Sequence, residues 1–320
     1  MRFIFRADAS PEIGSGHVMR SSVLAEEAIS RGYECIFVGS ISGLNWVADR
    51  ISTLGFAQVL SDESSFVADA ETDVLVLDSY SIPVSDAFIA KTNWRFAMSI
   101  CDQVSPKYAV DIELRPGLEK PGEIPATPIV LSGAEHILIR KGIVKSIQMK
   151  HEGGITRVLV VGGGSDPFGY VPAVAEVIRS LKFNLEVHLF TNEEIHTKFF
   201  EGVVFHPIGT ELDLIAREVD VVLTTASTSS LEFIAREIPT GMVCAMGNQE
   251  DYFEQLGRLG YATQIGVRTL AEGWEFNVEA IKDLLGSQEK RNALKQAVSG
   301  LIDLKGAERV IDFLVSFKTP

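Results

Sequence analysis

The first twenty residues place a histidine beside two glycines and an acid. His17 follows Gly14 and Gly16 just before an amphipathic helical pattern begins, and Asp8 lies upstream, after the apolar segment 2–6. Histidine acts as a general base near neutral pH, glycine lets backbone approach a ligand closely, and a carboxylate such as Asp8 can orient an imidazole. Strand–turn–helix junctions of this kind bind anionic groups. The motif favours chemistry on a phosphorylated or nucleotide-linked substrate over a plain helix start with a surface histidine.

A second glycine-rich turn, residues 162–167, follows another apolar strand-like segment. Its glycines expose backbone N–H groups that can bind a diphosphate, with Gly163, Gly164 and Ser165 as the candidate contacts. The turn is not a dinucleotide fingerprint, because Pro167 takes the third glycine position. It is not a P-loop either, because no Gly-Lys-Ser/Thr follows. The alternative is a tight turn in which Ser165 caps a helix.

Small hydroxyl residues gather where a third strand-like segment meets a helical pattern, at residues 224–230. Ser227, Thr228 and Ser229 can bind phosphate oxygens through their hydroxyl and N–H groups, and Glu232 can accept hydrogen bonds from ribose hydroxyls. The alternative is an N-capping cluster in which Glu232 complements the helix dipole. Because one hydroxyl residue is enough for a cap, we favour a binding role.

Two more polar segments follow strand-like segments. Asn248 and Gln249 carry neutral amides, which both donate and accept hydrogen bonds and therefore suit sugar hydroxyls and amides. Tyr80, which comes after Asp78 at the end of segment 73–78, can line a sugar pocket. The alternatives are a polar loop and a partly buried tyrosine whose hydroxyl is already satisfied.

The bulk composition excludes several classes of protein. The chain has 320 residues, 46% of them hydrophobic, which is enough for two domains with sizeable cores. A net charge of −14 disfavours binding to nucleic acid or anionic membranes. The chain has three cysteines far apart in sequence, which argues against a disulfide framework. It shows no apolar run of membrane-spanning length, no signal peptide and no set of metal ligands. We expect a reduced, cytoplasmic, monomeric protein without metal or other cofactor, acting on a small molecule.

Strand and helix patterns alternate along both halves of the chain. They predict an α/β fold of two Rossmann-like, doubly wound domains that face each other across a cleft. We expect an N-terminal domain over 1–145, a polar linker over 140–156 and a C-terminal domain over 156–320, with the last helix packing back on the first domain. Expected elements include a helix at 85–92, a loop at 115–128 and mostly helices after residue 245.

These motifs together resemble the UDP-sugar hydrolases of pseudaminic acid biosynthesis, which are related to two-Rossmann (GT-B) glycosyltransferases. That family's opening, Arg-x-Asp-Ala/Ser-Ser-x-x-Ile-Gly-x-Gly-His-x-x-Arg, is matched by Arg6, Asp8, Ser10, Ile13, Gly14, Gly16, His17 and Arg20. The resemblance spans nearly the whole chain and continues through Asp78, Tyr80, 133–140, 163–167, 227–232, Asn248, Gln249, Gly306 and Ala307.

The resemblance implies hydrolysis of UDP-2,4-diacetamido-2,4,6-trideoxy-β-L-altropyranose to UDP and the free sugar, by inverting attack of water at the anomeric carbon without a metal. His17 would match the family's catalytic base, and Tyr80 and Asn248 its sugar-pocket residues. Diphosphate and ribose would be bound by Ser165, Ser227 and Glu232. Further candidate substrate contacts on the matched motifs are Gly14, Gly16, Arg20, Asp78, Gly163, Gly164, Thr228, Ser229 and Gln249.

One departure from that family concerns the sugar. The chain has Cys101 and Asp102 where the family commonly has a pair of acids, and the segment 111–116 is a poor match to the family's next motif. UDP binding is unaffected by this difference, whereas the identity of the sugar stays open. Two alternatives remain: a glycosyltransferase that passes the sugar from a UDP-sugar to an acceptor, and a nucleotide-sugar sensor or inactive subunit.

Overall fold

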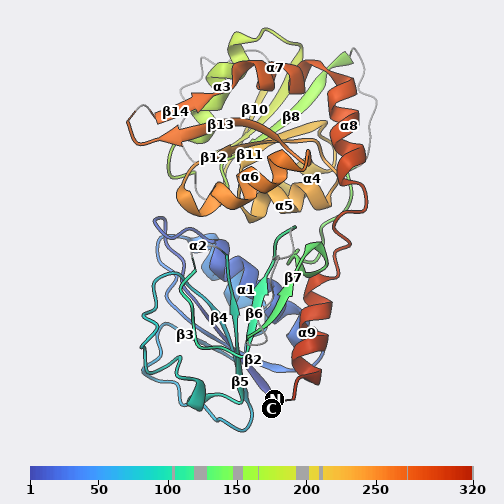
Figure 1. Ribbon diagram of the computed structural model, residues 1–320. Helices are drawn as coiled ribbons and strands as arrows, with labels where there is room; N and C mark the ends of the chain where they lie inside the picture. Colours follow the sequence, from blue (N-terminus) through green and yellow to red (C-terminus); the bar gives the residue numbers. More distant parts are fainter. Residues whose placement is uncertain are drawn as a thin grey trace. The chain divides into compact units, whose positions relative to one another are not determined.

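The chain folds into two compact units, and each contains one seven-stranded sheet (Figure 1). Unit 1 comprises Met1–Lys141 together with Asp303–Pro320, and unit 2 comprises Gly142–Ile302. The computed structural model describes residues 1–102, 105–118, 128–146, 154–164, 166–191, 202–208, 212–271 and 273–318. None of the helices in these ranges is both long enough and apolar enough to span a bilayer.

The sheet of unit 1 is parallel throughout, in the order β3-β2-β1-β4-β5-β6-β7. Its strands are β1 (Arg2–Ala7), β2 (Glu34–Val38), β3 (Gln58–Leu60), β4 (Asp73–Asp78), β5 (Phe96–Ile100), β6 (Ile112–Arg115) and β7 (Ile129–Ser132). The central strands β1 and β4 are buried at nearly every position because both sheet faces are covered. One face packs against α1 (Gly16–Ser30), α2 (Asn45–Thr53) and α9 (Gly306–Ser316).

The sheet of unit 2 has the order β10-β9-β8-β11-β12-β13-β14, and only the last pair of strands is antiparallel. Its strands are β8 (Thr156–Val161), β9 (Leu185–Phe190), β10 (Val203–His206), β11 (Val221–Thr225), β12 (Thr240–Cys244), β13 (Thr263–Thr269) and β14 (Gly273–Phe276). Its helices are α3 (Tyr170–Ser180), α4 (Leu212–Ala216), α5 (Thr228–Ala235), α6 (Glu250–Arg258), α7 (Val278–Gly286) and α8 (Gln288–Val298).

Each sheet has a point at which its strand order reverses. In unit 1 the chain runs outward from β1 to β3 and then returns to place β4 on the other side of β1; in unit 2, β8 and β11 have the same relation. The loops after two such adjacent strands diverge to opposite faces, which leaves room for a ligand at their carboxyl ends. Every motif singled out above, apart from the late Gly306-Ala307 pair, lies at or just after the carboxyl end of a strand.

The fold class is confirmed, but one local prediction was wrong. Segment 85–92 is not a helix: the Asp86 carboxylate accepts the Phe88 N–H at 2.8 Å, a local bond that competes with helix formation, and only a short 3₁₀ turn, Lys91–Asn93, follows. The loop predicted over 115–128 lies mostly outside the described residues, and its first residue, Arg115, is the last residue of β6. Helices α6, α7, α8 and α9 fill much of the chain after residue 245, as predicted, and the β13–β14 hairpin, whose strands are half-exposed and lack a continuous apolar run, lies among them.

Candidate active site

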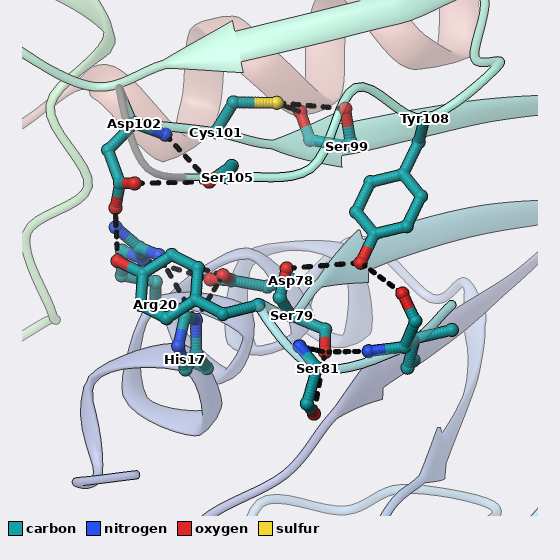
Figure 2. Close-up of polar contacts among 12 residues, drawn as sticks. His17, Arg20, Asp78, Ser79, Ser81, Ser99, Cys101, Asp102, Ser105 and Tyr108 are labelled. Atoms are coloured by element: carbon teal, nitrogen blue, oxygen red, sulfur yellow. Dashed lines mark hydrogen bonds and ion pairs between the residues drawn. The ribbon is translucent and has the colours of Figure 1, made fainter. Parts of the chain in front are cut away.

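The His17 imidazole pairs with a buried carboxylate at the strand-reversal point of unit 1 (Figure 2). His17 is the second residue of α1, and Asp78 is the last residue of β4, level with Ala7 on β1. His17 Nδ1 lies 2.5 Å from Asp78 Oδ1. Because an ionised carboxylate can only accept hydrogen bonds, this contact requires the proton on Nδ1. The tautomer therefore leaves the lone pair on Nε2.

Arg20 binds both oxygens of the same carboxylate. It lies three residues after His17 and so projects from the same face of α1. Its Nε donates to Asp78 Oδ2 at 2.9 Å and its Nη2 to Oδ1 at 2.7 Å, a bidentate geometry. Burial alone would raise the pKa of the fully buried Asp78, but the charges and hydrogen bonds of Arg20 and His17 outweigh it and hold this pKa below its usual value. Asp78 is therefore an anion that fixes the imidazole.

Tyr80 and Asp102 extend this network along the carboxyl edge of the sheet. The Tyr80 hydroxyl donates to Asp102 Oδ2, and Arg20 Nη1 lies 3.6 Å from the same oxygen. Burial raises the pKa of Tyr80, and the bond to Asp102 adds to that effect, so the phenol stays protonated. The Tyr80 ring meets the His17 ring edge to face, with their centroids 4.2 Å apart. Asp102 was not predicted as a site residue. It follows the carboxyl end of β5, and this position after a strand is the feature of the sequence that could have identified it.

The arrangement suits general base catalysis by His17 Nε2. No described residue forms a hydrogen bond with Nε2, because both contacts of the ring are made by Nδ1. Nε2 is also not one of the fully buried atoms that lack a partner, so it is open to a water molecule. A buried anion behind Nδ1 stabilises the imidazolium that forms when Nε2 takes a proton. The imidazole ring would be kept in one orientation during this proton transfer by Asp78, Arg20 and Tyr80.

The hypothesis that Asp8 orients His17 is not borne out. The Asp8 carboxylate accepts the Ser40 N–H at 2.8 Å and pairs with Arg6 at 2.7 Å, so it ties β1 to the segment after β2. Asp78 holds the position at the imidazole instead.

Of the two glycines before His17, Gly14 has a φ of +84°, which few other residues adopt, whereas a Cβ at Gly16 would meet open space.

Cys101, at the position where the hydrolases that the motifs resemble commonly carry an acid, is a neutral group. Burial raises the pKa of its thiol to about 12, and its Sγ lies 2.9 Å from Ser99 Oγ. Asp102 beside it is therefore the acid at this strand end. The site consequently has one negative charge fewer here than a pair of acids would supply.

In unit 2 the glycine turn after β8 lies against the hydroxyl segment after β11. A Cβ at Gly163, whose φ is +86°, would come within 3.6 Å of Thr225 Oγ1, so the two segments approach closely. Ser165 lies outside the described residues. The helix that follows is capped by Asp166, whose carboxylate accepts the N–H groups of Tyr170 and Val171 at 2.8 and 3.0 Å.

The hydroxyl segment caps α5 and also exposes groups at its N-terminus. Ser227 Oγ accepts the Ser229 N–H at 3.3 Å, as the capping alternative predicts. Thr228 and Ser229 form the first turn of α5 and are half-buried, and Glu232 lies one turn further. A cap uses only one of these groups, so the N-terminus of α5 keeps N–H and hydroxyl groups that suit an anion.

The two amides after β12 have different environments. The Gln249 side chain is engaged in the loop itself, because its Oε1 accepts the Ala245 N–H at 2.9 Å. Asn248 Oδ1, by contrast, is buried and has no hydrogen-bond partner among the described residues. A buried acceptor without a partner is costly unless a ligand or water satisfies it. Asn248 is thus the better candidate for contacting a substrate.

Comparison with known proteins supports the resemblance seen in the motifs. No protein-family model matches the chain. UDP-2,4-diacetamido-2,4,6-trideoxy-beta-L-altropyranose hydrolase from Campylobacter jejuni is 24% identical over 171 residues, 51% of this chain. The match spans 61% of the length of that curated relative. The chain is similar to this hydrolase.

Solved structures show the same architecture over the full length. The glycosyltransferase of kitacinnamycin aligns with a TM-score of 0.66 and 14% identity over 98% of both chains. MurG from Acinetobacter baumannii aligns with a TM-score of 0.63 and 10% identity, over 99% of this chain and 100% of its own. A putative UDP-N-acetylglucosamine 2-epimerase from Listeria monocytogenes aligns with a TM-score of 0.64 and 12% identity, over 100% of this chain and 98% of its own. The fold is therefore the two-Rossmann, GT-B type.

Proposed function

We propose that the chain hydrolyses a UDP-linked sugar at the anomeric C–O bond and releases UDP and the free sugar. The observation that carries the proposal is the 2.5 Å contact between His17 Nδ1 and the buried Asp78 carboxylate, which leaves Nε2 as a base. Similarity to the Campylobacter hydrolase supports a UDP-linked diacetamido-trideoxy sugar as the substrate. The related GT-B structures support nucleotide-sugar chemistry only through their fold.

In the proposed reaction, a water molecule hydrogen-bonded to His17 Nε2 attacks the anomeric carbon from the side opposite to UDP. Nε2 takes one proton of the water as the new C–O bond forms. The bond between the anomeric carbon and the UDP oxygen breaks, and its electron pair leaves with UDP. The configuration at that carbon inverts. Asp78 stabilises the imidazolium meanwhile, without itself taking the proton.

The groups proposed to bind UDP belong to unit 2. N–H groups of the glycine turn and of the α5 N-terminus would hold the diphosphate, Glu232 the ribose and Asn248 the sugar. Negative charge builds up on UDP as the C–O bond breaks, and fixed N–H donors stabilise it without reorganising. Loss of one such donor typically costs on the order of 100-fold in rate.

Hydrolysis in ¹⁸O-labelled water tests the bond that breaks. The protein is incubated with the UDP-diacetamido sugar, and both products are analysed by mass spectrometry. We expect the label in the free sugar and none in UDP. Label in UDP alone would mean cleavage at phosphorus and would overturn the mechanism.

A glycosyltransferase remains the second candidate, because one of the aligned structures is the glycosyltransferase of kitacinnamycin. The same base could deprotonate an acceptor hydroxyl in place of water. UDP release is therefore measured with and without added sugar and lipid acceptors. Release that depends on an acceptor would favour the transferase, whereas equal release in both samples supports the hydrolase.

A further inference from the structure

Arg268 on β13 of unit 2 lies on an aromatic ring that follows the glycine turn. Its guanidinium carbon is 4.0 Å from the centroid of Phe168, which lies between that turn and α3. Phe168 is itself fixed, because Trp274 Nε1 donates to its carbonyl oxygen at 2.9 Å. The ring contact thus holds a positive charge at one defined place.

That place is at the ligand-binding edge of the sheet. β13 runs parallel to β12, with Val267 level with Cys244, so Arg268 lies just beyond the last paired residue of β12. The segment bearing Asn248 leaves the sheet at the same edge, and so does the hydroxyl segment after β11. Arg268 therefore belongs to the same end of unit 2 as the groups proposed to bind UDP.

Arg268 has no acidic partner in the part of the chain that the structure describes. No carboxylate there lies within 4.0 Å of its guanidinium, although the chain has 43 acidic and 29 basic residues. In unit 2, Arg157, Arg179 and Arg236 are all paired with acids. An arginine without a carboxylate at a ligand edge keeps its charge available for an anion.

Stacking determines which part of the guanidinium is available. The guanidinium lies over the Phe168 ring, so the ring covers one side of the group and the N–H groups on its other sides can reach a ligand. A planar fork of donors matches two phosphate oxygens, and this pairing is stronger and more specific than a lysine contact. Stacking also lowers the side-chain entropy that would be lost on binding.

We propose that Arg268 binds the diphosphate of the nucleotide substrate. The inference rests on the proposed function of this site. It explains how a protein with a net charge of −14 attracts a substrate that is itself a dianion: a local cation is set among the backbone N–H groups of unit 2. Phe168 and Trp274 act as positioning residues, because they place the guanidinium without touching the ligand.

Calorimetry with UDP, UMP and uridine tests the proposal without relying on turnover. The variants are Arg268→Ala and Arg268→Lys, and the control is Arg179→Ala, an exposed arginine on α3 that pairs with Glu176. We expect Arg268→Ala to weaken UDP binding by about 10- to 100-fold and to leave uridine binding unchanged, because a charged hydrogen bond to phosphate is lost. Arg268→Lys restores part of the affinity, and Arg179→Ala binds all three ligands like the wild type.

Each contrary result has a distinct meaning. Unchanged UDP affinity in Arg268→Ala overturns the inference while the proposed function stands. An equal loss for UDP and uridine also overturns it, since that would show a role in folding or in base binding; thermal unfolding of the variant is measured alongside. If the wild type binds no UDP at all, the proposed function falls, and the inference with it.

Discussion

At the scale of single residues, the decisive feature is a histidine whose two nitrogens have different tasks. Nδ1 is held by Asp78, which in turn is clamped by two hydrogen bonds from Arg20. A carboxylate buried without such partners would take up a proton instead of staying charged. The Arg20 guanidinium therefore keeps Asp78 ionised, and the ionised Asp78 orients the His17 imidazole so that Nε2 is the basic nitrogen.

Asp78→Asn tests this division of tasks. The amide is nearly isosteric but can present an N–H to Nδ1, which favours the wrong tautomer and places the proton on Nε2. We expect kcat for UDP release to fall by about 10²- to 10⁴-fold, with the UDP dissociation constant unchanged. Steady-state kinetics and calorimetry on the same preparation check this. Wild-type kcat in the variant would remove Asp78 from the mechanism.

The sequence pointed to the members of this cluster but not to their pairing. His17, Arg20, Asp78 and Tyr80 all lie in motifs visible in the sequence. Asp8 was the nearer acid in sequence, yet Asp78 is the nearer one in space, because β4 pairs directly with β1. That adjacency depends on the order of strands in the sheet, and no local pattern carries it.

At the scale of elements, the start of α9 shows how a surface pair secures a helix. Asp303 accepts the Lys305 N–H at 3.1 Å, and it pairs with Arg309 on the first turn of α9. The hydrogen bond from Arg309 is the main cause that lowers the pKa of Asp303 to about 2. Because the Asp303 side chain is 45% exposed, solvent screens the pair and its contribution is small.

The sign of that shift gives a pH prediction. A carboxylate whose pKa is lower in the folded state stabilises the fold above its unfolded value, near 3.8, and loses that contribution as the pH falls towards 2. Asp303→Asn should therefore cost about 0.5 kcal/mol at pH 6 and less below pH 4. Urea unfolding of both proteins over this range measures the difference. A difference that grows on acidification would contradict the assignment.

Long buried elements were predictable and short marginal ones were not. Each of the strands β1, β4, β8 and β12 contains a continuous apolar run, because helices or loops cover both faces of their sheets. β3 has three residues and is mostly exposed, so neither its length nor its pattern distinguishes it from a loop. Such edge strands form because a neighbouring strand offers free backbone groups, which is a property of the sheet.

At the scale of the whole molecule, the chain ends in the unit where it began. After leaving unit 2 at Ile302, it forms α9, which packs on α1 and the first sheet. Contact is close at Gly306, where a Cβ would lie 2.1 Å from the Ile137 carbonyl oxygen. Unit 1, which carries His17, is therefore built from both ends of the chain.

The return of the chain predicts that a change in the last helix destabilises the unit of the catalytic histidine. Leu314 is fully buried in the core of unit 1, whereas Val315, next to it on α9, is 36% exposed. Leu314→Ala leaves a cavity and should lower the free energy of unfolding by about 2–5 kcal/mol, and Val315→Ala by far less. Hydrogen exchange followed by mass spectrometry locates the effect. We expect faster exchange in β1 and α1, with exchange in β8 and β11 unchanged. Equal acceleration of exchange in both units would show that they unfold as one. No acceleration in β1 would show that α9 adds nothing to the stability of unit 1.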